Sequence, residues 1–222
     1  MYGWVLSIMD KKVIKSKFEK KEVAKLASFS IVMIPLATYL LGTKASPLYY
    51  SLSMIGNELG YRIDFIIWGI ATGLMLSFFI IRLFILKSFE NPAARRLLIL
   101  SLVFLVLTVL IPYMKNLTII NKIHSLFAVA FAFAVTASLY LFIKYLSETD
   151  QKIYSWSMRM LILIIGGSLV MLFLFGLTGI FELFFFFSLS TFLAILNRRL
   201  FRSDKKLKER SLVQSDVESW NG

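Results

Sequence analysis

The sequence predicts an all-α polytopic membrane protein, a bundle of six transmembrane helices with both termini in the cytoplasm. The chain is 58% hydrophobic and 17% charged, whereas soluble domains are about 45–50% apolar and about 25% charged. Its long uncharged runs lie near residues 26–43, 65–81, 97–114, 125–143, 160–178 and 183–197. Of 25 basic residues, the only ones in the first and third gaps are Lys44, Arg62, Lys115 and Lys122. Because cytoplasmic loops retain Lys and Arg, this asymmetry predicts the orientation.

The first part of the chain contains a basic leader, two spans and an unusual connection. Residues 1–23 are predicted to be a solvated cytoplasmic leader, with a helix lying in the interface as the alternative. The first span covers about 24–43 and the second about 63–84. Between them, residues 44–62 mix tyrosine and aliphatic residues with Ser, Asn and Glu. This composition predicts a segment that lies along the outer membrane interface, with its tyrosines at headgroup level.

The later spans are bounded by prolines, glycines and charges. Pro92 suits a helix start, so the third span is predicted at about 95–113. The fourth covers about 124–144, and its alanines predict that it is the most buried helix. From Arg159 to Arg198 the single ionisable residue is Glu182. One helix of this length would measure about 57 Å, so the run must fold into spans at about 159–178 and 181–198. Residues 199–222 are predicted to be a polar cytoplasmic tail, partly disordered beyond about 210.

Polar residues from four separate segments are predicted to gather at the outer end of the bundle. They are Ser53, Asn57, Asp64, His124 and Glu182. Ionisable groups near hydrocarbon are costly and therefore suggest function. We expect them to line an outward-facing pocket, floored by small residues of the second and fourth spans, with Glu182 paired to His124 or Arg62. The alternative is that each is only an interfacial or helix-start residue.

Several classes of chemistry are disfavoured. The chain has no cysteine and one histidine, so thiolate and histidine-rich metal sites are excluded. It also lacks a phosphate-binding loop and a dinucleotide fingerprint, so we expect no metal and no cofactor. The net charge of +12 flanks the spans on one side, which fits membrane orientation and predicts no nucleic-acid partner.

Two short motifs resemble those of a known superfamily. The first, SLSMIGNELGYRIDFIIWG, occupies residues 51–69, and the second, KIHSLFAVAFAF, contains His124. Together with Glu182 near the last span, they resemble the six-span superfamily of damage-regulated autophagy modulators. That superfamily also includes FGF-receptor-activating-protein-like and Sfk-like proteins and bacterial relatives. The resemblance covers roughly residues 24–198 and implies a role in membrane lipid handling.

The sequence therefore favours a non-catalytic protein that binds or organises a lipid or hydrophobic ligand in the outer pocket. Alternatives are a small proton-coupled transporter, a lipid headgroup hydrolase or transferase, and an accessory subunit of a membrane complex. Gly69, Gly73 and Ser77 recur every four residues, which predicts close approach of a partner helix or a second copy. Short loops and abundant Lys, Ile and Phe predict a multi-pass protein of the bacterial inner membrane.

Overall fold

The computed structural model describes residues 25–114 and 116–220, with side chains up to residue 203 except residue 149. The predicted leader, residues 1–23, lies outside this range. Within it the chain is helical and contains no β-strand. Six helices among these described residues are long and apolar enough to cross a membrane. The predicted fold class, an all-α polytopic bundle, is therefore confirmed.

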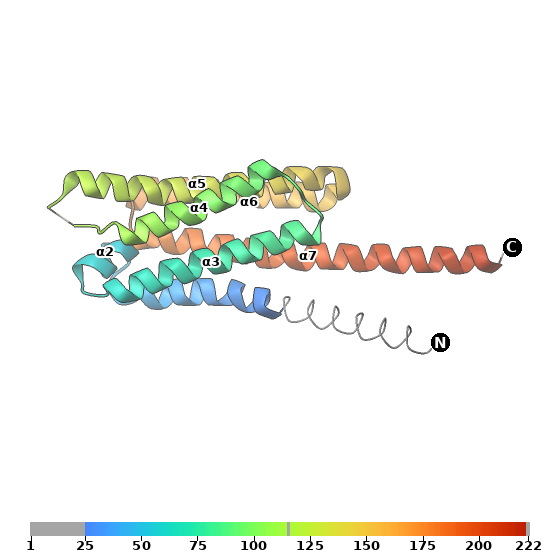
Figure 1. Cartoon of the computed structure of the whole chain (residues 1–222), viewed down its shortest axis with the longest axis horizontal. Coiled ribbons are helices and arrows are strands. Elements are labelled where there is room, and N and C mark those ends of the chain that lie inside the picture. The colour runs from blue at the N-terminus through green and yellow to red at the C-terminus, as the bar shows by residue number, and fades with distance from the viewer. Residues whose placement is uncertain (1–24, 115, 221–222) are drawn as a thin grey trace, which may run out of the picture.

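The helices run antiparallel along one long axis (Figure 1). The first helix is Lys25–Gly42, followed by α3 Arg62–Leu86, α4 Pro92–Leu110, α5 Thr118–Thr149, α6 Gln151–Phe175 and α7 Gly179–Trp220. One short helix, α2 Leu52–Glu58, lies in the connection between the first helix and α3. We call the end that carries α2 the mouth and the opposite end, from which α7 projects, the tail end (Figure 1). The first helix begins and α7 finishes at the tail end, while the cytoplasmic location of that end stays a prediction.

Local sequence signals explain where these helices begin and end. The Asn91 side chain accepts from the Ala94 amide at 3.0 Å, and Pro92 occupies the first helical position of α4. Asp150 caps α6 by accepting from the Ile153 amide at 3.1 Å. Gly176, with φ 68°, ends α6 and opens the turn into α7. The hairpin that the long uncharged run predicts is therefore present.

The last helix is longer than the sequence indicates. It continues to Trp220, whereas we predicted a polar, partly disordered tail after the sixth span. Residues 199–220 contain neither glycine nor proline and are rich in Lys, Arg, Glu and Leu. These residues have high helix propensity, so the helix continues past the membrane-spanning part.

The small-residue stripe on α3 is used within the chain. A methyl group added at Gly73 would lie 2.7 Å from Leu102 Cδ1, and one added at Gly69 would collide with Val109, both on α4. Gly69 and Gly73 are buried, and Ser77 is partly buried. The stripe therefore allows α3 and α4 to approach closely. A second copy or another partner would have to bind a different face.

The prediction that the fourth span is the most buried is wrong. In the most apolar 18-residue stretch of each helix, 44% of the residues are buried in α3 and in α7, and 39% are buried in α5. One face of α5 is open, with Leu126 65% and Phe133 71% exposed. The last helix instead contacts several others: Phe186 packs on Trp68 of α3 and on Phe131 of α5. Position in the bundle, rather than alanine content, sets the burial.

The turn between α5 and α6 is fastened to α7 by Asp150, which lies outside the membrane-spanning segments. Its carboxylate accepts from Ser203 Oγ at 2.7 Å. Partial burial raises the pKa of Asp150, but the bonds from Ser203 and from the amides of Ile153 and Lys152 outweigh it. Together with the nearby charge of Lys87, they leave the pKa below its ordinary value.

We expect Asp150→Ala to lower the free energy of unfolding in detergent by about 1 kcal/mol at pH 7, since it removes a helix cap. A lowered pKa stabilises the fold above the unfolded-state value, and this stabilisation is lost as the pH falls through the folded-state value. The difference between wild type and variant should therefore shrink below about pH 4. Thermal unfolding at pH 7 and pH 3 measures it. A difference that grows on acidification would contradict the assignment.

Candidate functional site at the mouth

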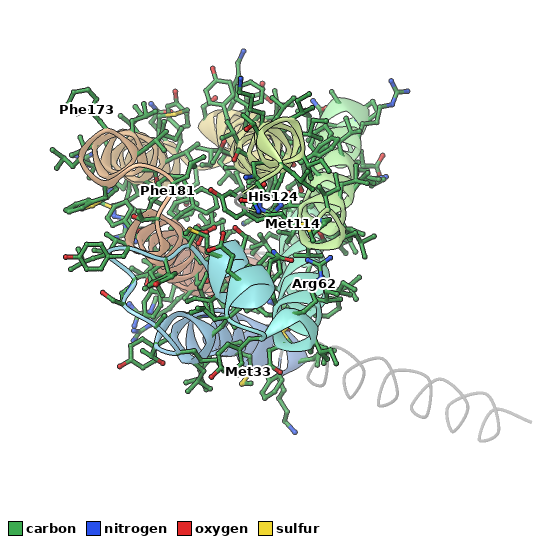
Figure 2. The ribbon with its side chains drawn as sticks, turned by 90° about the vertical axis from the view of Figure 1, so that its left-hand side faces the viewer. Met33, Arg62, Met114, His124, Phe173 and Phe181 are labelled. Atoms are coloured by element: carbon green, nitrogen blue, oxygen red, sulfur yellow. The ribbon has the colours of Figure 1, made fainter. Side chains whose placement is uncertain are left out.

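The mouth is covered by α2, which lies against the ends of the spanning helices (Figures 1 and 2). Its inward face consists of Leu52, Ser53, Ile55 and Gly56, all buried. A methyl group at Gly56 would lie 2.5 Å from Phe65 Cβ, so only glycine allows α2 to sit this close to α3. The segment predicted to lie along the interface is thus also a packed part of the bundle.

Aromatic rings fill the space beneath α2. Phe65 stacks on Trp68 with ring centroids 5.7 Å apart, and Trp68 meets Phe186 edge-on at 5.3 Å. Phe186 in turn stacks on Phe131 of α5 at 5.9 Å. The predicted floor of small residues is therefore replaced by a packed aromatic layer. This layer joins α3, α5 and α7 directly below the polar groups.

Glu182 fastens α2 to the last helix. One carboxylate oxygen accepts a hydrogen bond from the Leu52 amide at 2.6 Å, across 130 positions in the sequence. Leu52 is the first residue of α2, and Glu182 lies in the first turn of α7. The carboxylate therefore lies near the amino ends of two helices, where their dipoles favour negative charge. This explains why a carboxylate is tolerated in a partly buried position.

Backbone hydrogen bonds reinforce the same junction. The Gly179 amide donates to Tyr50 O at 3.0 Å, and the Ile180 amide donates to Pro47 O at 3.0 Å. These amides belong to the first turn of α7, where a helix has no partners of its own for its N–H groups. The connection before α2 supplies those partners. The first outer connection and the α6–α7 hairpin therefore form one hydrogen-bonded unit.

A second junction joins α2 to the end of α4. Arg62 donates to the Asn57 side chain and, at 2.7 Å, to Leu110 O. His124 Nδ1 lies 2.9 Å from Ile111 O. A carbonyl can only accept, so Nδ1 carries the proton. Arg62 and His124 thus satisfy the carbonyls at the end of α4, and the helix dipole there favours the Arg62 guanidinium.

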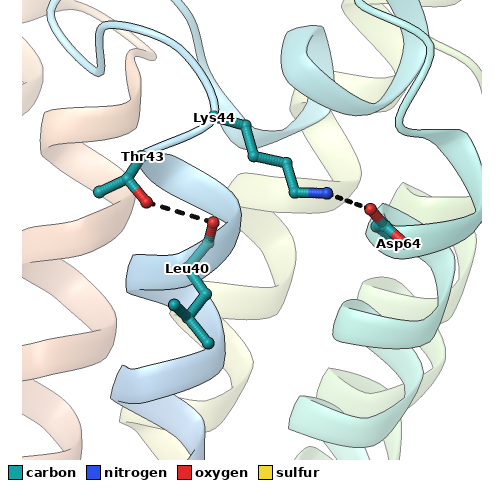
Figure 3. Close-up of polar contacts among 4 residues, drawn as sticks. All are labelled: Leu40, Thr43, Lys44 and Asp64. Atoms are coloured by element: carbon teal, nitrogen blue, oxygen red, sulfur yellow. Dashed lines mark hydrogen bonds and ion pairs between the residues drawn. The ribbon is translucent and has the colours of Figure 1, made fainter.

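Asp64 lies apart from these groups. It pairs with Lys44 across the exposed rim between the first helix and α3 (Figure 3). The Lys44 ammonium also lies 4.0 Å from the centroid of the Tyr61 ring. Exposed pairs of this kind contribute at most about 1 kcal/mol. In the first turn of α3 the carboxylate also suits the helix dipole.

The structure therefore divides the five predicted residues into three groups. Ser53 and Glu182 hold the amino end of α2, Asn57 and His124 belong to the junction with α4, and Asp64 stands at the rim. In the described part of the chain, no hydrogen bond or ion pair links Glu182 to His124 or Arg62. The predicted pairing is not present.

Nucleophilic chemistry is not assembled around Ser53. Its hydroxyl lies 2.9 Å from Ser51 Oγ, and Ser51 in turn caps α2 by accepting from the Met54 amide at 3.1 Å. A serine nucleophile needs a base within hydrogen-bond reach, and here its neighbour is another hydroxyl. Sequence reasoning missed Ser51 as the cap. The available signal is a serine directly before a helix, three residues ahead of the amide that it caps, that of Met54.

An open groove of about 510 Å³ lies beside the mouth on α5. Its polar end contains Thr118, Asn121, Lys122 and Ser125, and its apolar end contains Leu126 and Val129. Tyr113 completes the lining, and its ring meets that of His124 edge-on, with centroids 5.8 Å apart. The groove therefore adjoins the second junction. Sequence reasoning missed it because these residues look like an ordinary helix start.

Comparison with known proteins identifies no family for this chain. No protein-family model, curated protein or solved structure matches this chain. The resemblance to the six-span superfamily thus remains a prediction. Among the described residues, no group of three or more His, Cys, Asp or Glu side chains could hold a metal ion.

Proposed function

We propose that this protein binds a phosphate-bearing lipid at its mouth, in the outer half of a bacterial inner membrane. The observation that carries the proposal is the groove on α5, whose lining changes from polar to apolar along the helix. From Thr118 to Val129 the helix rises about 16 Å, similar to one leaflet of hydrocarbon. A lipid fits with its headgroup at Lys122 and its chain on Leu126 and Val129.

The five residues predicted as ligand contacts have a supporting role in this proposal. Each is engaged within the chain: Ser53, Asn57 and Glu182 at α2, His124 at the end of α4, and Asp64 at the rim. His124 lies closest to the ligand in this arrangement, because Tyr113 contacts its ring and also lines the groove. The resemblance to proteins of membrane lipid handling supports the same function.

A proton-coupled transporter is favoured less. Carriers place their site near the middle of the membrane, between broken helices. In this bundle Glu182 and His124 already bind backbone groups at helix ends, and Asp64 is paired with Lys44. Stacked aromatic rings join α3, α5 and α7 below them. Ligand binding at the surface of α5 needs no such central space.

We expect Lys122→Gln to weaken lipid binding about fivefold, since one cation near a membrane surface contributes about 1 kcal/mol. Native mass spectrometry of the detergent-purified protein, titrated with a phospholipid, measures the occupancy. Lys144→Gln is the matched control, because Lys144 is exposed on the same helix near the tail end.

A second variant tests the groove without changing charge. Ser125→Phe should fill it and displace the lipid while leaving Lys122 in place. If Lys122→Gln and Ser125→Phe both retain the wild-type occupancy, the groove is not the binding site and the proposed function is wrong.

A further inference from the structure

A second groove of about 340 Å³ runs along the seam between α6 and α7. Its walls are largely apolar and include Met160 and Leu163 of α6 and Phe187 and Ile195 of α7. Leu163 is 62% exposed and Phe187 40% exposed, so the groove opens towards the surroundings of the bundle. The groove on α5 lies at the mouth. This second groove lies on other helices, and the charged residues beside it are at the tail end.

An indole closes this groove towards the tail end. Trp156 of α6 lines the groove and stacks on Phe192 of α7, with ring centroids 5.9 Å apart. The Arg199 guanidinium lies 4.1 Å from the centroid of the Trp156 ring. Stacking on an aromatic ring holds a guanidinium in place while leaving its N–H groups free to bind an anion.

Further cations continue the groove on both helices. On α7, positions 198, 199 and 202 follow Ile195 by three, four and seven residues, which places them on the same helix face. On α6, positions 152 and 159 are four before and three after Trp156. The five residues are Lys152, Arg159, Arg198, Arg199 and Arg202. None of them is paired with an acidic side chain in the part of the chain that the structure describes.

We propose that this seam is a binding site for an anionic phospholipid of the leaflet at the tail end. Its phosphate groups would contact the guanidinium groups around Arg199, and one acyl chain would lie along the groove towards Phe187. From Arg199 to Phe187 the helix rises about 18 Å, close to the thickness of one leaflet. A cation that contacts the headgroup favours an anionic over a zwitterionic lipid by about fivefold near the membrane surface, so two such contacts, one from each wall, would give a preference of more than about tenfold.

The indole of Trp156 provides the readout. The full-length protein in detergent is titrated with phosphatidylglycerol or phosphatidylcholine whose acyl chains carry bromine, which quenches nearby tryptophan fluorescence. The component of the quenching that is present in wild type and absent in Trp156→Phe is assigned to the groove. We expect this component to appear at phosphatidylglycerol concentrations at least tenfold below those of phosphatidylcholine.

A charge-matched pair of variants tests the cause. Arg159→Gln with Arg199→Gln removes one cation from each wall and should abolish most of the tenfold preference. Arg96→Gln with Lys144→Gln removes two exposed cations from α4 and α5 near the same end and should preserve it. An equal response to both lipids in wild type, or a preference that survives Arg159→Gln with Arg199→Gln, would overturn the proposal.

Two further outcomes have distinct meanings. A dimeric protein whose Trp156 is quenched by neither lipid would show that a second copy covers the seam, and the proposal would fail. Loss of lipid in Lys122→Gln alone would concern only the groove on α5, so the two sites are separable.

Discussion

The substitution Gly179→Val should destabilise the bundle strongly. A methyl group at Gly179 would lie 2.6 Å from Tyr50 O and 3.1 Å from Pro47 Cα. These are backbone atoms, so no change of rotamer can relieve the contact. The connection before α2 would have to move, and the hydrogen bonds from the amides of Gly179 and Ile180 would break. We expect a loss of about 3 kcal/mol in unfolding free energy.

Gly166→Val is the matched control for this prediction. Gly166 lies within α6, and a methyl group there would have no atom within 4 Å apart from its own helix. Both variants replace glycine by the same β-branched residue, and only the one at 179 meets backbone. Thermal unfolding of both proteins in the same detergent measures the difference. Equal midpoints would show that the docking of residues 47–50 on α7 contributes little to stability.

The positions of the helices were predictable because each depends on local composition. A membrane-spanning helix satisfies its own backbone and needs only about 20 apolar residues, so uncharged runs locate it. The α6–α7 hairpin follows from the same argument, since a run with one ionisable residue, Glu182, was too long for one crossing. Gly176 then supplied a backbone conformation that other residues rarely adopt.

The arrangement at the mouth was not predictable because its contacts join distant parts of the chain. Glu182 binds a backbone amide 130 positions away, and His124 binds a carbonyl at the end of another helix. Any residue can present a backbone amide or carbonyl, so the sequence carries no mark of such a partner. Charge and hydropathy place both side chains near the outer end of the bundle. They do not show which group each side chain binds there.

The stripe of Gly69 and Gly73 illustrates the same division. Small residues indicate that a helix approaches closely, and this expectation was right. They do not indicate which helix approaches, and α4 of the same chain takes the place considered for a second copy. The groove on α5 was overlooked for a related reason. Its residues become a site only because Tyr113, from the preceding connection, closes one side.

The substitution Glu182→Ala should release α2 from the mouth. A helix of seven residues does not form by itself, so α2 depends on its packing and its caps. Without the carboxylate, the amide of the buried Leu52 loses its acceptor, which costs about 1–3 kcal/mol. The chain contains no cysteine, so Ser53→Cys introduces a single thiol into the buried face of α2. Alkylation of this thiol should become roughly 5- to 150-fold faster when Glu182→Ala is added, since this cost makes the opening of α2 that much more frequent.

The variant Glu182→Gln separates hydrogen bonding from charge. Glutamine keeps an oxygen that can accept from the Leu52 amide, but it removes the negative charge between the amino ends of α2 and α7. If the hydrogen bond alone holds α2, the thiol should react as slowly as in the Ser53→Cys protein with Glu182 intact. If the helix dipoles stabilise the carboxylate as we infer, Glu182→Gln should give an intermediate rate. Equal alkylation rates in Ser53→Cys with and without Glu182→Ala would show that Glu182 does not hold the mouth closed.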